Sequence, residues 1–135
     1  MVKITNTYGK NAGKIWHVLN KHGTLTPTQL MKKTGLTRED LYTALGWLAK
    51  ENKIIFDDNN FSLGDYNWNT TIGPNAGKVW DVVETCEEID TKYIPKLADI
   101  SDIDFYYAIG WLAKEGKIDT KKVRSPKSLT KISKK

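Results

Sequence analysis

The chain contains one unit twice, and this repeat limits its possible folds more than any other feature. The segment NAGKIW at 11–16 returns as NAGKVW at 75–80, and ALGWLAKENKI at 44–54 returns as AIGWLAKEGKI at 108–118. Both pairs are offset by 64 residues, so no insertion separates the two blocks. Over 46 aligned positions, 19 are identical. Such self-similarity predicts two domains of the same fold.

Each unit carries the start and stop signals of three helices. In the first unit, Asn11 is expected to cap the first helix, which Gly23 would end. Thr26 followed by Pro27 predicts the start of a second, short helix, because proline is tolerated at the first helical position. Thr37 begins a capping-box-like start of the third helix. Ser101 repeats this start in the second unit.

A hairpin signal follows the third helix of the first unit. The sequence KIIFDDNNFSL at 53–63 has two β-rich runs around a turn-forming Asp-Asp-Asn-Asn. The second unit has KIDTKKV at 117–123 instead, which predicts a reduced hairpin or one completed late by Leu129 and Ile132. Helix, helix–turn–helix and hairpin is the order of a winged helix. The expected fold is therefore mainly α with small β-hairpin wings, in two tandem winged-helix (helix-turn-helix) domains.

The letters of both copies resemble a family of small prokaryotic winged helix-turn-helix domains without assigned function. The resemblance rests on NAGKIW at 11–16 and on ALGWLAKE at 44–51 with Lys53 and Ile54. It covers both copies and implies the fold far more firmly than an activity. The tandem arrangement and the basic C-terminal segment depart from the single-domain pattern.

Domain boundaries follow from the repeat and from composition. We expect winged-helix domain 1 at 1–64, a linker at 65–72, winged-helix domain 2 with a reduced wing at 73–122, and a basic, disordered tail at 123–135.

Charge is distributed unevenly along the chain. Residues 1–64 carry nine Lys or Arg against five Asp or Glu, a balance of +4, and residues 65–120 carry five against eleven, a balance of −6. The segment 121–135 has seven basic residues and no acid, and the three balances sum to the net charge of +5. A basic first half and a basic end suit a polyanion, whereas the acidic middle would repel one.

A helical wheel separates the core face of the third helix of each unit from its outward face. In the first unit the outward face holds Glu39, Thr43, Gly46 and Lys50. A glycine inside a helix costs about 1 kcal/mol relative to alanine. Gly46 therefore predicts close approach of a phosphate, a backbone or another helix, mainly within the chain. The alternatives are simple inheritance of glycine by both copies, or room for a neighbouring ring.

The flanking Trp47 and Trp111 are expected to seal the edges of small cores, with exposed partner anchors as the alternative. In the second unit, the outward Ile103 and Tyr107 are apolar where a DNA reader needs polar groups. They predict a protein contact, with domain 1, with a partner protein or in a homodimer. The alternative is contact with the linker. The candidate protein-interface residues are Ile103, Tyr107, Gly110 and Trp111.

The first unit is the better nucleic-acid candidate. Its basic and polar residues could reach bases or phosphates, although Glu39 and the acidic wing tip oppose this and a plain solvated surface is the alternative for each lysine. The C-terminal segment could add salt-sensitive phosphate contacts, fold back on domain 2, or only increase solubility. The candidate DNA-binding residues are Lys32, Lys33, Arg38, Thr43, Lys50, Lys121, Lys122, Arg124 and Lys127.

No constellation typical of catalysis or of a cofactor site is present in the sequence. GKNAGK at 9–14 lacks the spacing and the Ser or Thr of a phosphate-binding loop, so Gly13 and Gly77 are expected to allow tight helix packing instead. A lone Cys86 and two histidines indicate neither a disulfide nor a metal site. We expect a non-enzymatic cytoplasmic protein with no cofactor, no metal, no membrane span and no evident small-molecule ligand.

Two functions remain open from the sequence. The favoured one is a DNA-binding protein, regulator-like or chromatin-like, that holds double-stranded DNA with domain 1 and the basic end while domain 2 contacts protein. The alternative is a protein–protein interaction scaffold that does not bind DNA specifically.

Overall fold

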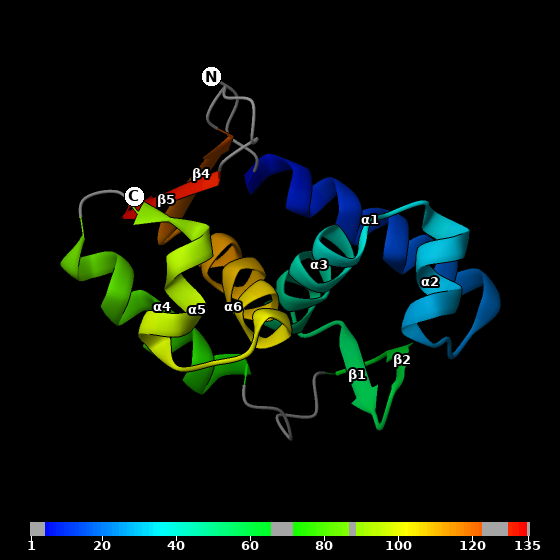
Figure 1. Ribbon diagram of the computed structural model, residues 1–135. Helices are drawn as coiled ribbons and strands as arrows, with labels where there is room; N and C mark the ends of the chain where they lie inside the picture. The colour runs from blue at the N-terminus through cyan, green and yellow to red at the C-terminus, as the bar shows by residue number, and fades with distance from the viewer. Residues whose placement is uncertain (1–4, 66–71, 87–88, 123–129, 135) are drawn as a thin grey trace.

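A computed structural model describes residues 5–65, 72–86, 89–122 and 130–134 (Figure 1). Both units fold as winged helices, in the element order expected from the sequence. Domain 1 comprises α1 (Thr5–His22), α2 (Pro27–Thr34), α3 (Arg38–Lys50), β1 (Ile54–Asp57) and β2 (Asn60–Leu63). Domain 2 comprises α4 (Ile72–Thr85), β3 (Ile89–Asp90), the 3-10 helix η1 (Thr91–Tyr93), α5 (Ile94–Ala98), α6 (Asp102–Lys114), β4 (Ile118–Lys122) and β5 (Thr130–Lys134).

The helix starts follow local signals with one exception. Thr26 forms the full capping box with Gln29 at the start of α2, and Thr37 and Ser101 cap α3 and α6 through their hydroxyls. The expected cap at Asn11 is wrong, because α1 already begins at Thr5 and Asn11 lies within it, 5% exposed. The helix extends before Asn11 although Thr5, Asn6, Thr7 and Gly9 are weak helix formers. Tertiary packing stabilises this turn, because Tyr8 is 5% exposed and Gly9 lies against the Trp47 ring.

The wings are small antiparallel sheets packed at the ends of the helices. Strands β1 and β2 pair with Ile54 opposite Leu63, and Leu25 adds a bridge to Phe61. In domain 2, β5 lies between β3 and β4, with Ile132 opposite both Ile89 and Thr120. In each domain the wing therefore pairs with the segment between the first two helices of that domain.

The second wing corrects the expected domain boundaries. Residues 130–134 form a paired strand, so the expectation of a disordered tail is wrong for them, and late completion of the wing by Ile132 is confirmed. Ile132 is fully buried in the core of domain 2, which therefore extends to β5. Most of the expected linker (66–71) and of the expected tail (123–129 and Lys135), including Leu129, lies outside the described residues.

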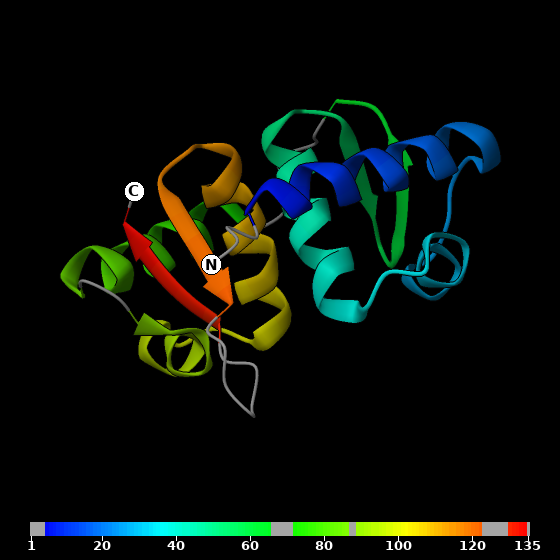
Figure 2. The same ribbon diagram turned by 90° about the horizontal axis from the view of Figure 1, so that it is seen from above.

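The two domains lie side by side with α3 and α6 between them (Figures 1 and 2). Leu41, Leu45 and Leu48 of α3 are at most 1% exposed and face the core of domain 1. Phe105, Ile109 and Leu112 occupy the corresponding positions of α6 and are buried in domain 2. The remaining faces of these two helices form the junction between the domains.

Candidate nucleic-acid interface

Helices α3 and α6 cross so closely that only glycine fits at the crossing. A Cβ atom on Gly46 would overlap the carbonyl oxygen of Tyr107, and a Cβ atom on Gly110 would overlap that of Thr43. Gly110 stands 64 residues after Gly46, and Tyr107 stands 64 residues after Thr43. Each glycine therefore admits the backbone of the other copy at the equivalent turn. The repeated glycine reflects an approach of two helices within one chain.

Charged and aromatic side chains at the C-terminal ends of α3 and α6 repeat this reciprocity. Lys50 lies 3.5 Å from the Glu115 carboxylate and 5.0 Å from the ring centre of Trp111. Lys114, its equivalent, lies 3.6 Å from Glu51 and 5.2 Å from the ring centre of Trp47. Each lysine thus combines an ion pair and a cation–π contact across the junction. The matched contacts relate the domains by an approximate two-fold axis.

Aromatic rings close the junction on its other side. The Tyr107 ring meets that of Tyr42 edge-on at 5.1 Å between centroids and lies 5.6 Å from that of Phe56 on the first wing. Burial, and to a smaller extent the charges on Tyr42 and Asp104, raises the pKa of the Tyr107 phenol well above its usual range. Tyr107 therefore stays neutral and acts as a packing residue.

This junction changes the interpretation of two predicted DNA contacts. Thr43 is 4% exposed, and its hydroxyl donates to the carbonyl of Asp40. Lys50 is engaged with Glu115 and Trp111. The outward face of α3, which reads bases in helix-turn-helix proteins, is covered by α6. We therefore leave Thr43 and Lys50 out of any DNA-binding surface.

The predicted protein-interface residues of domain 2 lie on α6. Tyr107 and Gly110 contact domain 1 directly, and Trp111 takes part through Lys50. Ile103 is half-buried in the first turn of the same helix. In this arrangement the protein that Tyr107, Gly110 and Trp111 contact is the other half of the same chain.

The first helices pack against the tryptophans through glycines other than the expected ones. A Cβ atom on Gly9 would lie 3.1 Å from the Trp47 ring, and one on Gly73 would lie 3.7 Å from the Trp111 ring. A Cβ atom on Gly13 or Gly77 would meet nothing within 4 Å. The expectation that Gly13 and Gly77 allow tight helix packing is therefore wrong. The tryptophans seal the edges of the domains by packing against Gly9 and Gly73, which lie one turn earlier in α1 and α4 than Gly13 and Gly77.

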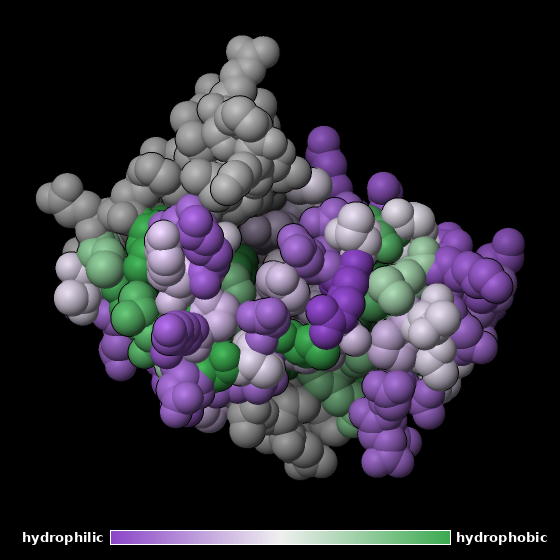
Figure 3. Space-filling view, viewed as in Figure 1, coloured by the Kyte–Doolittle hydropathy of each residue, from purple (hydrophilic) through white to green (hydrophobic). Residues whose placement is uncertain are grey.

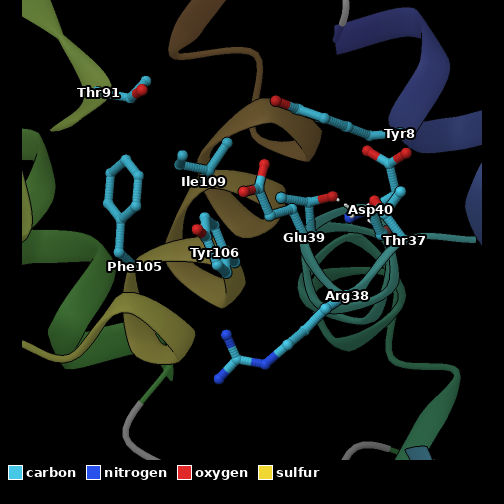
Figure 4. A pocket seen from close by; sticks show the side chains of 10 residues that line it. Tyr8, Thr37, Arg38, Glu39, Asp40, Thr91, Phe105, Tyr106 and Ile109 are labelled. Atoms are coloured by element: carbon cyan, nitrogen blue, oxygen red, sulfur yellow. Dashed lines mark hydrogen bonds between the residues drawn. The ribbon is translucent and has the colours of Figure 1, made fainter. Parts of the chain in front are cut away.

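Acidic residues surround the N-terminal ends of α3 and α6. There a hollow of about 510 Å³ lies between the domains, and its walls include Tyr8, Glu39, Asp40, Phe105 and Tyr106. Figure 4 shows the carboxylates of Glu39 and Asp40 rising toward the side of the hollow that Tyr8 forms. Burial first, and then the charge of Glu39, raises the pKa of the Tyr106 phenol. This end of the two helices, which would enter a DNA groove, repels phosphate.

Three predicted contacts of domain 1 are exposed. Lys32 and Lys33 lie in the last turn of α2, and Arg38 begins α3 with its guanidinium 5.9 Å from the ring centre of Tyr42. Hydrophilic side chains lie along the outer edge of domain 1, next to less polar ones (Figure 3). Lys32 and Lys33 are therefore available to a partner, whereas Arg38 stands beside the acidic hollow.

Two of the four predicted contacts near the C-terminus belong to the second wing. Lys121 and Lys122 are in β4, although only their backbone is described, and Arg124 and Lys127 lie outside the described residues. The start of α1 lies beside β4 (Figure 2). The fold thus brings a segment more than a hundred residues away along the chain next to the first helix of domain 1.

Sequence reasoning missed the acidic partners of the junction. Glu51 and Glu115 end the two identical GWLAKE segments and each accepts a lysine of the other domain. The sequence does contain a signal for these contacts. The charged residues are identical in both copies and follow the outward glycine closely, so they are expected to lie at the same junction as the glycine. A helical wheel shows which face of a helix points away from the core of its own domain, but it does not show what covers that face.

The described part of the chain contains no group of three or more His, Cys, Asp or Glu side chains placed to hold a metal ion. Among the described helices, none has both the length and the apolar character that crossing a membrane requires.

The order of helices, the two wings and the paired third helices define a tandem winged-helix protein. The family model of the winged helix-turn-helix domain DUF2582 matches residues 1–64 and again residues 66–131. The chain belongs to this family and contains its domain twice, as the sequence resemblance implied. No curated protein and no solved structure matches the chain.

Proposed function

We propose that the protein binds double-stranded DNA through domain 1 and the second wing, while α3 and α6 join the domains. The supporting observation is the charge of the two chain segments that meet beside β4. Residues 1–38 contain seven Lys or Arg and no Asp or Glu, and residues 121–135 contain the same numbers. Helix α1 and strand β4, which belong to these two basic segments, are neighbours in the fold. Such a concentration of positive charge favours a polyanion.

The winged helix-turn-helix fold favours a nucleic acid among the polyanions. Lys32 and Lys33 of α2 are the proposed phosphate contacts of domain 1, with Arg38 at its margin. Lys121, Lys122, Arg124 and Lys127 are the proposed contacts of the second wing. In this proposal domain 2 contributes its wing, and its helix α6 packs against α3. The acidic rest of domain 2 faces away from the duplex.

The experiment is a salt titration of duplex binding by the full chain and by a wing variant. Truncation at residue 120 is unsuitable because it would remove the buried Ile132. The variant K121Q/K122Q/R124Q/K127Q removes four charges and retains β5. Binding by the wild type should weaken steeply between about 50 and 200 mM salt, and the variant should reduce the slope of log K against log salt by up to about 3.6.

Two results would contradict the proposal. One is negligible binding of duplex DNA by the full chain at about 50 mM salt. The other is an unchanged salt slope in the wing variant. The first result, together with a protein that copurifies with the chain, would favour the alternative function of an interaction scaffold that does not bind DNA specifically.

A further inference from the structure

Helix α1 carries a row of exposed basic residues along most of its length. Lys10, Lys14, His17 and Lys21 follow one another at intervals of three or four residues and are all exposed. This spacing places side chains on one face of a helix. The opposite face, with Tyr8, Ala12, Ile15 and Leu19, is buried in the core of domain 1. The basic row therefore points away from the protein.

No acidic residue interrupts this row. Helix α1 contains three lysines, two histidines and no Asp or Glu. The equivalent helix α4 has Asp81 where α1 has His17, and Glu84 where α1 has Asn20. Since the two helices occupy the same place in the same fold, the fold does not require the positive charge of α1. The difference indicates a role for this one surface.

The row is also placed next to the other basic segment. Figure 2 shows α1 crossing in front of α3, from the edge of β4 to the outer end of domain 1. It shows β4 and β5 in front of α6, on the same side of the molecule. The acidic hollow at the N-terminal ends of α3 and α6 is a different surface, lined in part by Glu39 and Asp40.

From this arrangement we infer that α1, and not the third helix of either domain, is the element that docks on the duplex. The inference rests on the proposed function and specifies its surface. The basic row lies along the phosphates, the second wing extends the contact, and α3 stays covered by α6. Because lysines on phosphates carry no sequence information, this binding is independent of base sequence.

The dimensions of the row suit a duplex. From Lys10 to Lys21 the helix rises about 16 Å, at about 1.5 Å per residue. A duplex presents one negative charge per about 1.7 Å of its axis. Three lysines spread over this length can each reach a separate phosphate along one backbone. Additional contacts by Lys32, Lys33 and the wing would lie beyond the two ends.

The experiment compares two triple variants with equal loss of charge. K10Q/K14Q/K21Q removes the row, and K78Q/K92Q/K96Q removes three exposed lysines of domain 2 as the matched control. Binding to a labelled duplex of about 20 base pairs is measured by fluorescence anisotropy between about 50 and 200 mM salt, with two unrelated base sequences. Circular dichroism and melting verify that both variants fold.

The row variant should bind about tenfold or more weakly at low salt, with a salt slope smaller by up to about 2.7. The domain 2 control should bind like the wild type, and K10R/K14R/K21R, which keeps the charges, should restore binding. Both duplex sequences should bind equally.

The outcomes separate this inference from the proposed function. If the wild type binds duplex and the row variant binds equally well, the inference is overturned and the proposed function stands. A strong preference for one of the two sequences would also overturn it, since it would require readout of bases. If the wild type binds no duplex but binds vesicles that contain phosphatidylserine, both proposals are overturned and the row is a membrane-docking surface.

Discussion

Domain 1 and domain 2 have the same fold but use it differently at two places. The C-terminal halves of their third helices are nearly identical, and the two helices meet at equivalent turns, at Gly46 and Gly110. Their first helices differ in charge, since α1 has no acidic residue and α4 has Asp81 and Glu84. Their wings differ too, because the turn between β1 and β2 is short and the connection between β4 and β5 spans residues 123–129.

The comparison shows which parts of the fold are tied to the junction and which can vary. The α3–α6 crossing requires a glycine from both copies because it is reciprocal. The first helices expose one face to solvent, and that face can take either charge while the buried face keeps the core. Three substitutions test this difference between the constrained and the variable parts.

The largest effect is expected in the second wing. Ile132→Ala should destabilise domain 2 by about 2–5 kcal/mol, because the side chain is fully buried and its loss leaves a cavity. Urea unfolding would measure the change. Leu97→Ala is the control, since Leu97 is 61% exposed and its loss should have little effect. Equal stability of the two variants would mean that β5 is not part of the core.

The helix crossing should respond next. Gly110→Ala would place a methyl group against the carbonyl of Thr43, and the resulting overpacking should cost about 1–3 kcal/mol. Gly77→Ala is the matched control, because a Cβ atom there meets nothing within 4 Å. It should increase stability by up to about 1 kcal/mol through helix propensity. If both variants shifted the urea midpoint in the same direction, the close crossing would be contradicted.

The smallest effect concerns the pH dependence of Tyr107. Its pKa is raised in the folded state, so the contribution to stability is complete below the unfolded pKa of about 10 and is lost as the pH rises above it. At pH 11 the wild type should lose about 1 kcal/mol relative to Tyr107→Phe, compared with the difference at pH 8. Unfolding of both proteins at the two pH values measures this. A constant difference would show that the phenol is not desolvated.

The sequence predicted the parts of the fold that depend on local signals. Thr26, Thr37 and Ser101 cap their helices as expected, because a cap involves only the next few residues. Asn11 failed as a cap because polar residues also occur inside helices, where tertiary packing decides. The sequence left two alternatives for the second wing, a reduced hairpin or one completed late by a strand such as β5. Local signals could not decide between them, because the pairing of β5 with β3 joins residues far apart in sequence.

The candidate site was predicted less well than the fold, for a physical reason. The wheel correctly separated Thr43, Gly46 and Lys50 from the core of their own domain. It could not show that α6 covers them, because this contact joins two separate cores. The exposed row on α1 has a regular spacing in the sequence, but the third helix is the usual DNA reader, so the spacing alone does not identify this row as a binding surface.

The reciprocal crossing has a consequence for how this chain tolerates change. A side chain added at Gly46 would clash with the backbone of domain 2, and one added at Gly110 would clash with the backbone of domain 1. Neither clash can be relieved by repacking within the mutated domain alone. Compensation must arise in the opposite copy, at positions that are themselves constrained. The two copies of the hexapeptide GWLAKE therefore constrain each other, and a change in one copy requires a matching change in the other domain.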